Sequence, residues 1–173
     1  MVRRQFILLF LAIWPWASAQ AGDAAKSIYQ GPLERRIDAI ASIQPGLGTV
    51  MREIAYRFSN AYWAANGGNW GLAQYQLTSL REAEAAVELT RPQHAQMLAA
   101  FERSYSEPLA GSIANKDLEQ FNRRFSSAID GCNSCHEKTG YGFLRYQVPA
   151  AGESGAFLDF AAKSEPNAGK PKP

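Results

Sequence analysis

Four long stretches of this chain place apolar residues at three- and four-residue steps, and none alternates apolar and polar residues as a half-buried strand does. In the first stretch these positions run from Leu47 to Ala65. Each stretch ends at residues that break helices, so only short connections remain between them. Short connections make neighbouring helices antiparallel. The sequence therefore predicts an all-α fold, an antiparallel up-down-up-down four-helix bundle.

The breaks between the stretches have the composition of helix ends. Gly67-Gly68-Asn69 separates the first two, because glycine accepts the left-handed conformation of a helix C-cap and asparagine caps the next helix. Thr90-Arg91-Pro92-Gln93 has the pattern of a capping box with Thr90 as the N-cap. Pro108 is expected to kink or split the third helix, since proline lacks a backbone donor. Asn115-Lys116-Asp117 forms the last break.

The N-terminal residues have the pattern of a secretory signal peptide. Arg3 and Arg4 precede an apolar run, Phe6–Trp14, and small residues follow it at Ala17-Ser18-Ala19. This run is shorter than the roughly 20 residues that cross a bilayer, which favours a cleaved signal over the alternative of a membrane anchor. We expect residues 1–21 to be removed on export, which predicts a periplasmic protein without a membrane span.

The rest of the chain is expected to form three parts. Residues 22–44 lead into the bundle and have room for one short helix at Leu33–Ile43. Residues 45–149 make up the bundle itself. Residues 150–173 are rich in Ala, Gly, Pro and Lys, a composition typical of a flexible tail.

The charge balance argues against nucleic acid as a partner. Removal of the two arginines of the signal leaves 16 of the 18 basic residues against 16 acidic ones. No basic stripe with interleaved aromatic residues is present, so the sequence does not predict a phosphate-binding surface.

The only cysteine-containing segment, Cys132-Asn133-Ser134-Cys135-His136, fits the C-x-x-C-H pattern of covalent haem attachment. On a helix, residues three and four apart share a face, so both sulfurs and the imidazole point the same way. The two thiols then add to the vinyl groups of one porphyrin while the imidazole reaches the iron. The motif predicts one covalent haem c on Cys132 and Cys135, with His136 as the proximal iron ligand.

Three other interpretations use the same two cysteines. A disulfide is the ordinary fate of two thiols in an oxidising compartment. A thioredoxin-like redox pair belongs at the start of a helix after a strand, and no strand is predicted here. A zinc site needs two further ligands, and the only other histidine is His94. The export pattern, the histidine that follows directly and the helical context favour haem.

The sixth iron ligand has to come from earlier in the chain, because no methionine or histidine follows His136. In an up-down bundle, the end of the fourth helix shares its level with the start of the first and third helices and the end of the second. Met51, His94 and Met97 lie within about two turns of those ends. They are the candidates for this position, and an open or water-bound iron is the remaining alternative.

The chain resembles the cytochrome c-prime type, a four-helix bundle with C-x-x-C-H near the end of its last helix. It is similar to a family of exported, mostly uncharacterised cytochromes of that type. The resemblance spans residues 45–149 and rests on Gly46-Leu47-Gly48, Met51, Tyr62–Trp70, Cys132–His136 and Tyr141–Leu144. Met51 matches the distal position of this family and also lies on the apolar stripe of the first helix, so it is the favoured sixth ligand. A methionine that only fills space beside the porphyrin is the alternative.

One feature departs from the c-prime pattern. Cytochromes c-prime usually carry an arginine a few residues after the haem histidine, and this chain has Glu137-Lys138-Thr139-Gly140 there. Gas-binding behaviour that depends on that arginine is therefore not carried over to this protein.

These expectations favour electron transfer between exported redox partner proteins, because iron ligated by histidine and methionine has a closed coordination sphere and a raised potential. The alternative is a protein that binds nitric oxide or carbon monoxide at an open or weakly occupied sixth position. A haem enzyme needs a polar distal group, and only His94 is available for it. An electron carrier is therefore favoured over an enzyme. Proteins of this shape often form homodimers, and no sequence signal decides this.

Overall fold

The computed structural model of the chain describes residues 28–148 together with Leu158 and Phe160. The predicted signal peptide, residues 1–21, lies outside the described residues. So does the predicted tail, apart from Leu158 and Phe160, the second of which packs against the hydrophobic core.

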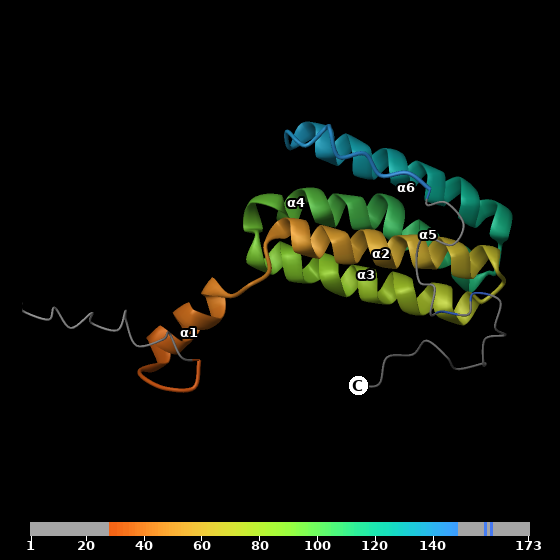
Figure 1. Cartoon of the computed structure of the whole chain (residues 1–173). Helices are drawn as coiled ribbons and strands as arrows, with labels where there is room; N and C mark the ends of the chain where they lie inside the picture. The colour runs from red at the N-terminus through yellow and green to blue at the C-terminus, as the bar shows by residue number, and fades with distance from the viewer. Residues whose placement is uncertain (1–27, 149–157, 159, 161–173) are drawn as a thin grey trace, which may run out of the picture. The chain divides into compact units, whose positions relative to one another are not determined.

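The described residues form helices and turns without any strand, which confirms the predicted all-α class (Figure 1). They belong to two compact units, divided between Gln44 and Pro45. The first unit contains α1, and the second contains all the later helices. The elements are α1 (Leu33–Ser42), α2 (Leu47–Asn66), α3 (Trp70–Thr90), α4 (Pro92–Phe101), the π-helical turn η1 (Glu102–Ser106), α5 (Glu107–Ala114) and α6 (Leu118–Lys138).

In the second unit, α2, α3, the rod formed by α4, η1 and α5, and α6 lie side by side (Figure 1). Phe58 of α2 stacks on Phe125 of α6 with ring centroids 4.0 Å apart, which joins the first and last helices of this unit. No helix in the described part is both long and apolar enough to cross a membrane. The buried core consists of Phe58, Ala64, Ala65, Ala73, Leu77, Leu80, Leu109, Ile113, Phe121, Phe125 and Ala128.

The break between α2 and α3 has the predicted chemistry. Gly68 has a φ of +79°, the left-handed conformation that favours glycine. The Asn69 side chain accepts a hydrogen bond from the amide of Leu72, with Oδ1 and N 3.0 Å apart. Asn69 is therefore the N-cap of α3, as predicted.

The predicted capping box at Thr90 is wrong. Helix α3 continues through Thr90, whose hydroxyl donates to the carbonyl of Ala86 in the preceding turn (2.7 Å). The N-cap of α4 is Arg91, which forms no side-chain capping hydrogen bond. A threonine hydroxyl can bond either forward or back along the helix, and here the backward bond is made.

The third rod is interrupted by a π-helical turn near Pro108, where the sequence predicted a kink or a split. The π-helical turn Glu102–Ser106 comes directly before the short helix that contains this proline. Proline cannot donate to the carbonyl four residues earlier, and its ring crowds that turn. A wider π turn accommodates both effects, so the rod passes the proline without ending.

Candidate haem site

Helix α6 carries the C-x-x-C-H motif in its last two turns. Its first turn is capped by Asp117, whose side chain accepts a hydrogen bond from the amide of Gln120 (2.9 Å). At the other end, Gly140 has a φ of +84° and the amide of Tyr141 donates to the carbonyl of His136 (2.7 Å). This is the hydrogen-bond pattern of a glycine C-cap, and it reverses the chain directly after the motif.

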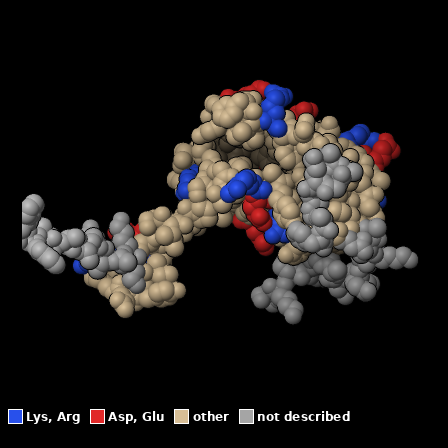
Figure 2. Space-filling view, in the orientation of Figure 1, with Lys and Arg blue, Asp and Glu red and all other residues tan. Residues whose placement is uncertain are grey.

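Cys132, Cys135 and His136 all line one cavity of about 340 Å³. The surface is visibly hollowed in Figure 2. The volume is within the range of small-molecule and cofactor sites, and most of the side chains around it are apolar. The walls are formed by Leu47, Gly48, Met51, Arg52, Ile54, Ala55, Glu84, His94, Met97, Leu98, Phe101, Cys132, Cys135, His136, Thr139, Tyr141 and Leu144.

The structure places all three candidate sixth ligands in this same cavity. Met51 comes from α2, and His94 and Met97 come from α4. The Met97 sulfur lies 2.9 Å from the sulfur of Cys135, so Met97 contacts one of the two cysteines of the motif. This contact distinguishes Met97 from the other two candidates.

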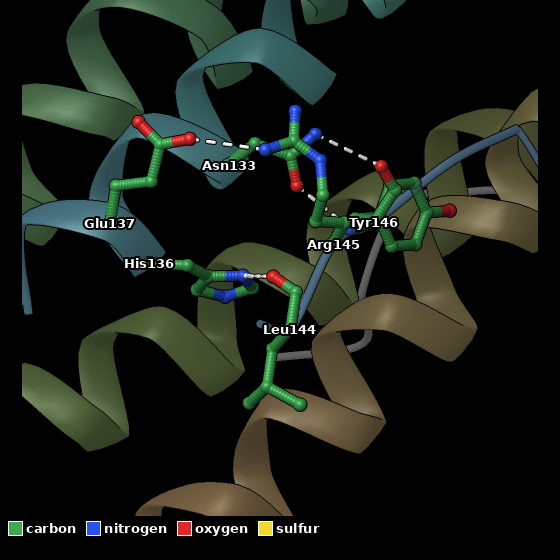
Figure 3. Close-up of polar contacts among 6 residues, drawn as sticks. All are labelled: Asn133, His136, Glu137, Leu144, Arg145 and Tyr146. Atoms are coloured by element: carbon green, nitrogen blue, oxygen red, sulfur yellow. Dashed lines mark hydrogen bonds and ion pairs between the residues drawn. The ribbon is translucent and has the colours of Figure 1, made fainter. Parts of the chain in front are cut away.

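The ring of His136 is held by a backbone carbonyl. Its Nδ1 lies 2.6 Å from the oxygen of Leu144 (Figure 3). A carbonyl oxygen can only accept, so Nδ1 carries the hydrogen and donates it. In a neutral imidazole, Nε2 then keeps its lone pair and is the nitrogen that can bind iron. The sequence marked Tyr141–Leu144 only as part of the resemblance and assigned no role to the Leu144 carbonyl, because a backbone acceptor can be any residue type.

Both cysteines are free and are held in the thiol form. Burial, and then the charges of Glu84 and Cys135, raise the pKa of Cys132 to about 12. Burial also raises the pKa of Cys135. A thioredoxin-like pair requires the opposite, an attacking sulfur with a lowered pKa at the start of a helix. The site therefore does not fit that alternative.

Helix α3 contributes an acidic residue that the sequence analysis did not identify. Glu84 is only 2% exposed, and its Oε2 has no hydrogen-bond partner among the described residues. Burial and the nearby carboxylates of Glu102 and Glu88 raise its pKa to about 8, although Arg81 and a hydrogen bond with Ser106 act in the other direction. Glu84 is therefore largely protonated at neutral pH. The sequence signal that could have identified Glu84 was its position on the apolar stripe of this helix.

The residues around the cavity fit a covalent haem. Two thiols and an imidazole with a free Nε2 open onto one largely apolar space, and the buried Oε2 of Glu84 adds no negative charge to it at neutral pH. The zinc alternative has less support, because no three His, Cys, Asp or Glu side chains of the described residues are arranged so that they could hold a metal ion together.

Comparison with family models, curated proteins and solved structures gave no match to this chain. The site is therefore interpreted from its own geometry, and the resemblance to the cytochrome c-prime type stays a hypothesis.

Proposed function

We propose that this protein is an exported mono-haem c-type cytochrome that transfers electrons through a haem ligated by His136 and Met51. One observation carries the proposal: Cys132, Cys135 and His136 of α6 line the same cavity as Met51 of α2. Haem bound there supplies one-electron oxidation and reduction of its iron. The partners are redox proteins of the periplasm, and the signal-peptide pattern of residues 1–21 supports this location.

The proposal includes the architecture. The second unit is an antiparallel up-down-up-down four-helix bundle of the cytochrome c-prime type. Short connections support it, since three residues separate α2 from α3, one separates α3 from α4, and three separate α5 from α6. Neighbours joined so tightly run antiparallel.

The residues of the cavity have different parts in this function. Cys132 and Cys135 hold the porphyrin by covalent bonds, which keep it attached in an exported protein. His136 offers Nε2, and its Nδ1 is oriented by the Leu144 carbonyl. Met51 offers a thioether, a soft ligand that raises the potential of haem iron. Met97 already contacts the Cys135 sulfur, which favours a packing role for it.

An optical spectrum of the haem-matured protein, recorded with and without carbon monoxide, tests the proposal. We expect low-spin iron and a reduced spectrum that carbon monoxide leaves unchanged, because Met51 fills the sixth position. A double Cys132→Ala, Cys135→Ala variant should carry no covalent haem. A high-spin spectrum that shifts with carbon monoxide would contradict electron transfer and support gas binding at an open iron.

Replacement of Met51 tests the sixth ligand directly. We expect Met51→Ala to convert the iron from low-spin to high-spin and to lower its midpoint potential, because the thioether ligand is lost. Optical spectroscopy and redox titration measure the two effects. Met97→Ala is the matched control, a methionine of the same cavity that should leave the iron low-spin. High-spin iron in the Met97 variant alone would transfer the ligand role to Met97.

A further inference from the structure

The chain after α6 folds back along this helix and is held by a residue inside the haem motif itself (Figure 3). The Nδ2 of Asn133 donates to the carbonyl of Tyr146 (3.0 Å), and the amide of Tyr146 donates to Oδ1 of Asn133 (2.8 Å). The side-chain amide thus pairs with both backbone groups of one residue. Asn133 is buried, so losing either bond leaves a polar group unpaired away from water.

Two further contacts hold the same segment. The hydroxyl of Tyr146 lies 2.7 Å from that of Ser59 on α2. Ser59 donates its own hydrogen to the carbonyl of Ala55 (2.8 Å), so the Tyr146 hydroxyl is the donor. Arg145 forms an ion pair with Glu137 (3.0 Å), but both side chains are well exposed and such pairs contribute little. Tyr146 is therefore the fixed point of this segment.

The carbonyl that orients the haem histidine lies two residues before this fixed point. We propose that Asn133 is a positioning residue: by holding Tyr146, it keeps the Leu144 carbonyl against Nδ1 of His136 and so sets the orientation and donor strength of the iron ligand. This inference rests on the proposed haem function. It gives a role to one of the two variable residues of the C-x-x-C-H motif.

The chemistry of the ring determines the direction of the effect. A hydrogen bond from Nδ1–H to a carbonyl makes the imidazole more basic, so Nε2 becomes a stronger donor. A stronger donor stabilises oxidised iron more than reduced iron, which lowers the midpoint potential. Weakening the contact between His136 and Leu144 should therefore raise the potential and expose the Nδ1 hydrogen to solvent.

Asn133→Ala in the haem-matured full chain tests this inference. We expect a higher midpoint potential than in the unmodified protein. We also expect the Nδ1 hydrogen of His136 to exchange with solvent at least about tenfold faster, as followed by NMR in the reduced protein. The free energy of the two lost hydrogen bonds is large enough to change the opening equilibrium of this segment by about that factor. Ser134→Ala, at the other variable position of the same motif, is the matched control and should change neither quantity.

Other variants separate positioning from a purely structural role. Tyr146→Phe removes the bond to Ser59 but keeps the backbone pairing with Asn133, so the potential should stay unchanged. Asn133→Gln keeps the amide on a longer side chain and is the second variant if Asn133→Ala does not accumulate; it should shift the potential in the same direction. An Asn133 variant that is less stable but has unchanged potential and exchange would overturn the inference.

The inference and the function on which it rests fail in different ways. An unmodified chain that matures without covalent haem would overturn the proposed function. A chain that carries haem, and whose potential is the same in the Asn133 and Ser134 variants, would overturn only the positioning role of Asn133.

Discussion

Burial changes the ionisation of two side chains around the cavity, Cys132 and Glu84. The Cys132 thiol and the Glu84 carboxyl both have a raised pKa, and in both burial is the main cause. Water stabilises the charged form of such groups, and an apolar site removes that stabilisation. Glu84 is the acidic residue that α3 contributes to the cavity wall. Because it is largely protonated at neutral pH, this wall is largely neutral where we expect an apolar cofactor to lie.

Glu84 makes stability depend on pH. Its pKa in the folded chain, about 8, lies above the ordinary value of 4.5, so the folded chain holds its proton more tightly than the unfolded chain. The contribution of Glu84 to the free energy of unfolding should therefore be fully present below pH 4.5 and be lost as the pH rises through 8, a fall of up to roughly 5 kcal/mol. We expect Glu84→Gln to remove most of this fall. Urea unfolding over this pH range measures it.

Glu82→Gln is the matched control for Glu84→Gln. Glu82 belongs to the same helix but is exposed, so its replacement should leave the pH dependence intact. A Glu84 variant with the same loss of stability between pH 4.5 and pH 8 as the unmodified chain would contradict the buried, protonated state of this residue.

At the scale of the element, the end of α6 determines where the chain goes after the motif. Gly140 follows the C-cap residue Thr139 and has a φ of +84°, and the return segment that contains Leu144 and Tyr146 comes after it. Apart from Gly140 and its two chain neighbours, no atom of the described residues lies within 4 Å of the position a Cβ would take there, so only the backbone conformation disfavours a side chain at this site.

Gly140→Ala should lower the free energy of unfolding by about 1 kcal/mol, because alanine is strained in the left-handed conformation. Gly111→Ala in α5 is the control. Its Cβ would meet Arg124 at an ordinary contact distance of 3.5 Å, and alanine favours a helix interior, so stability should rise by about 0.5–1 kcal/mol. Urea unfolding measures both. Equal effects of the two changes would contradict the conformational argument.

At the scale of the whole second unit, the helix that carries the motif packs closely against a segment that is distant in the sequence. Gly131, directly before Cys132, faces the ring of Tyr105 in η1. A Cβ at Gly131 would lie 2.5 Å from Cε2 of that ring. The absence of a side chain at Gly131 therefore allows α6 and the π-helical turn to approach each other next to Cys132.

We expect Gly131→Ala to lower the free energy of unfolding by about 1–3 kcal/mol, because the added methyl group overlaps the Tyr105 ring. A Tyr105→Ala change in the same chain should relieve the overlap, so the double variant should be more stable than the sum of the two single effects predicts. Urea unfolding of the four proteins measures this coupling. Strictly additive effects would show that Gly131 and Tyr105 do not constrain each other.

The sequence by itself determined the features that depend on neighbours along the chain. The 3.6-residue period predicted the helices, since it reports which face of each segment is apolar. Gly68 predicted a helix break and Asn69 a helix cap. These predictions succeeded because the backbone conformation of the glycine and the capping bond of the asparagine involve only residues within one turn. The C-x-x-C-H spacing placed Cys132, Cys135 and His136 on one face. The local prediction failed at Thr90, whose hydroxyl bonds back to the carbonyl of Ala86 and does not cap α4.

Only the tertiary structure decided the features that depend on segments meeting in space. It placed Met97 against Cys135 and buried Glu84 enough to keep its proton. It also supplied the Leu144 carbonyl to His136 through the pairing of Asn133 with Tyr146. The reason is physical: packing between segments decides how deeply a side chain is buried and which backbone carbonyl it reaches, and the residue types alone do not determine either.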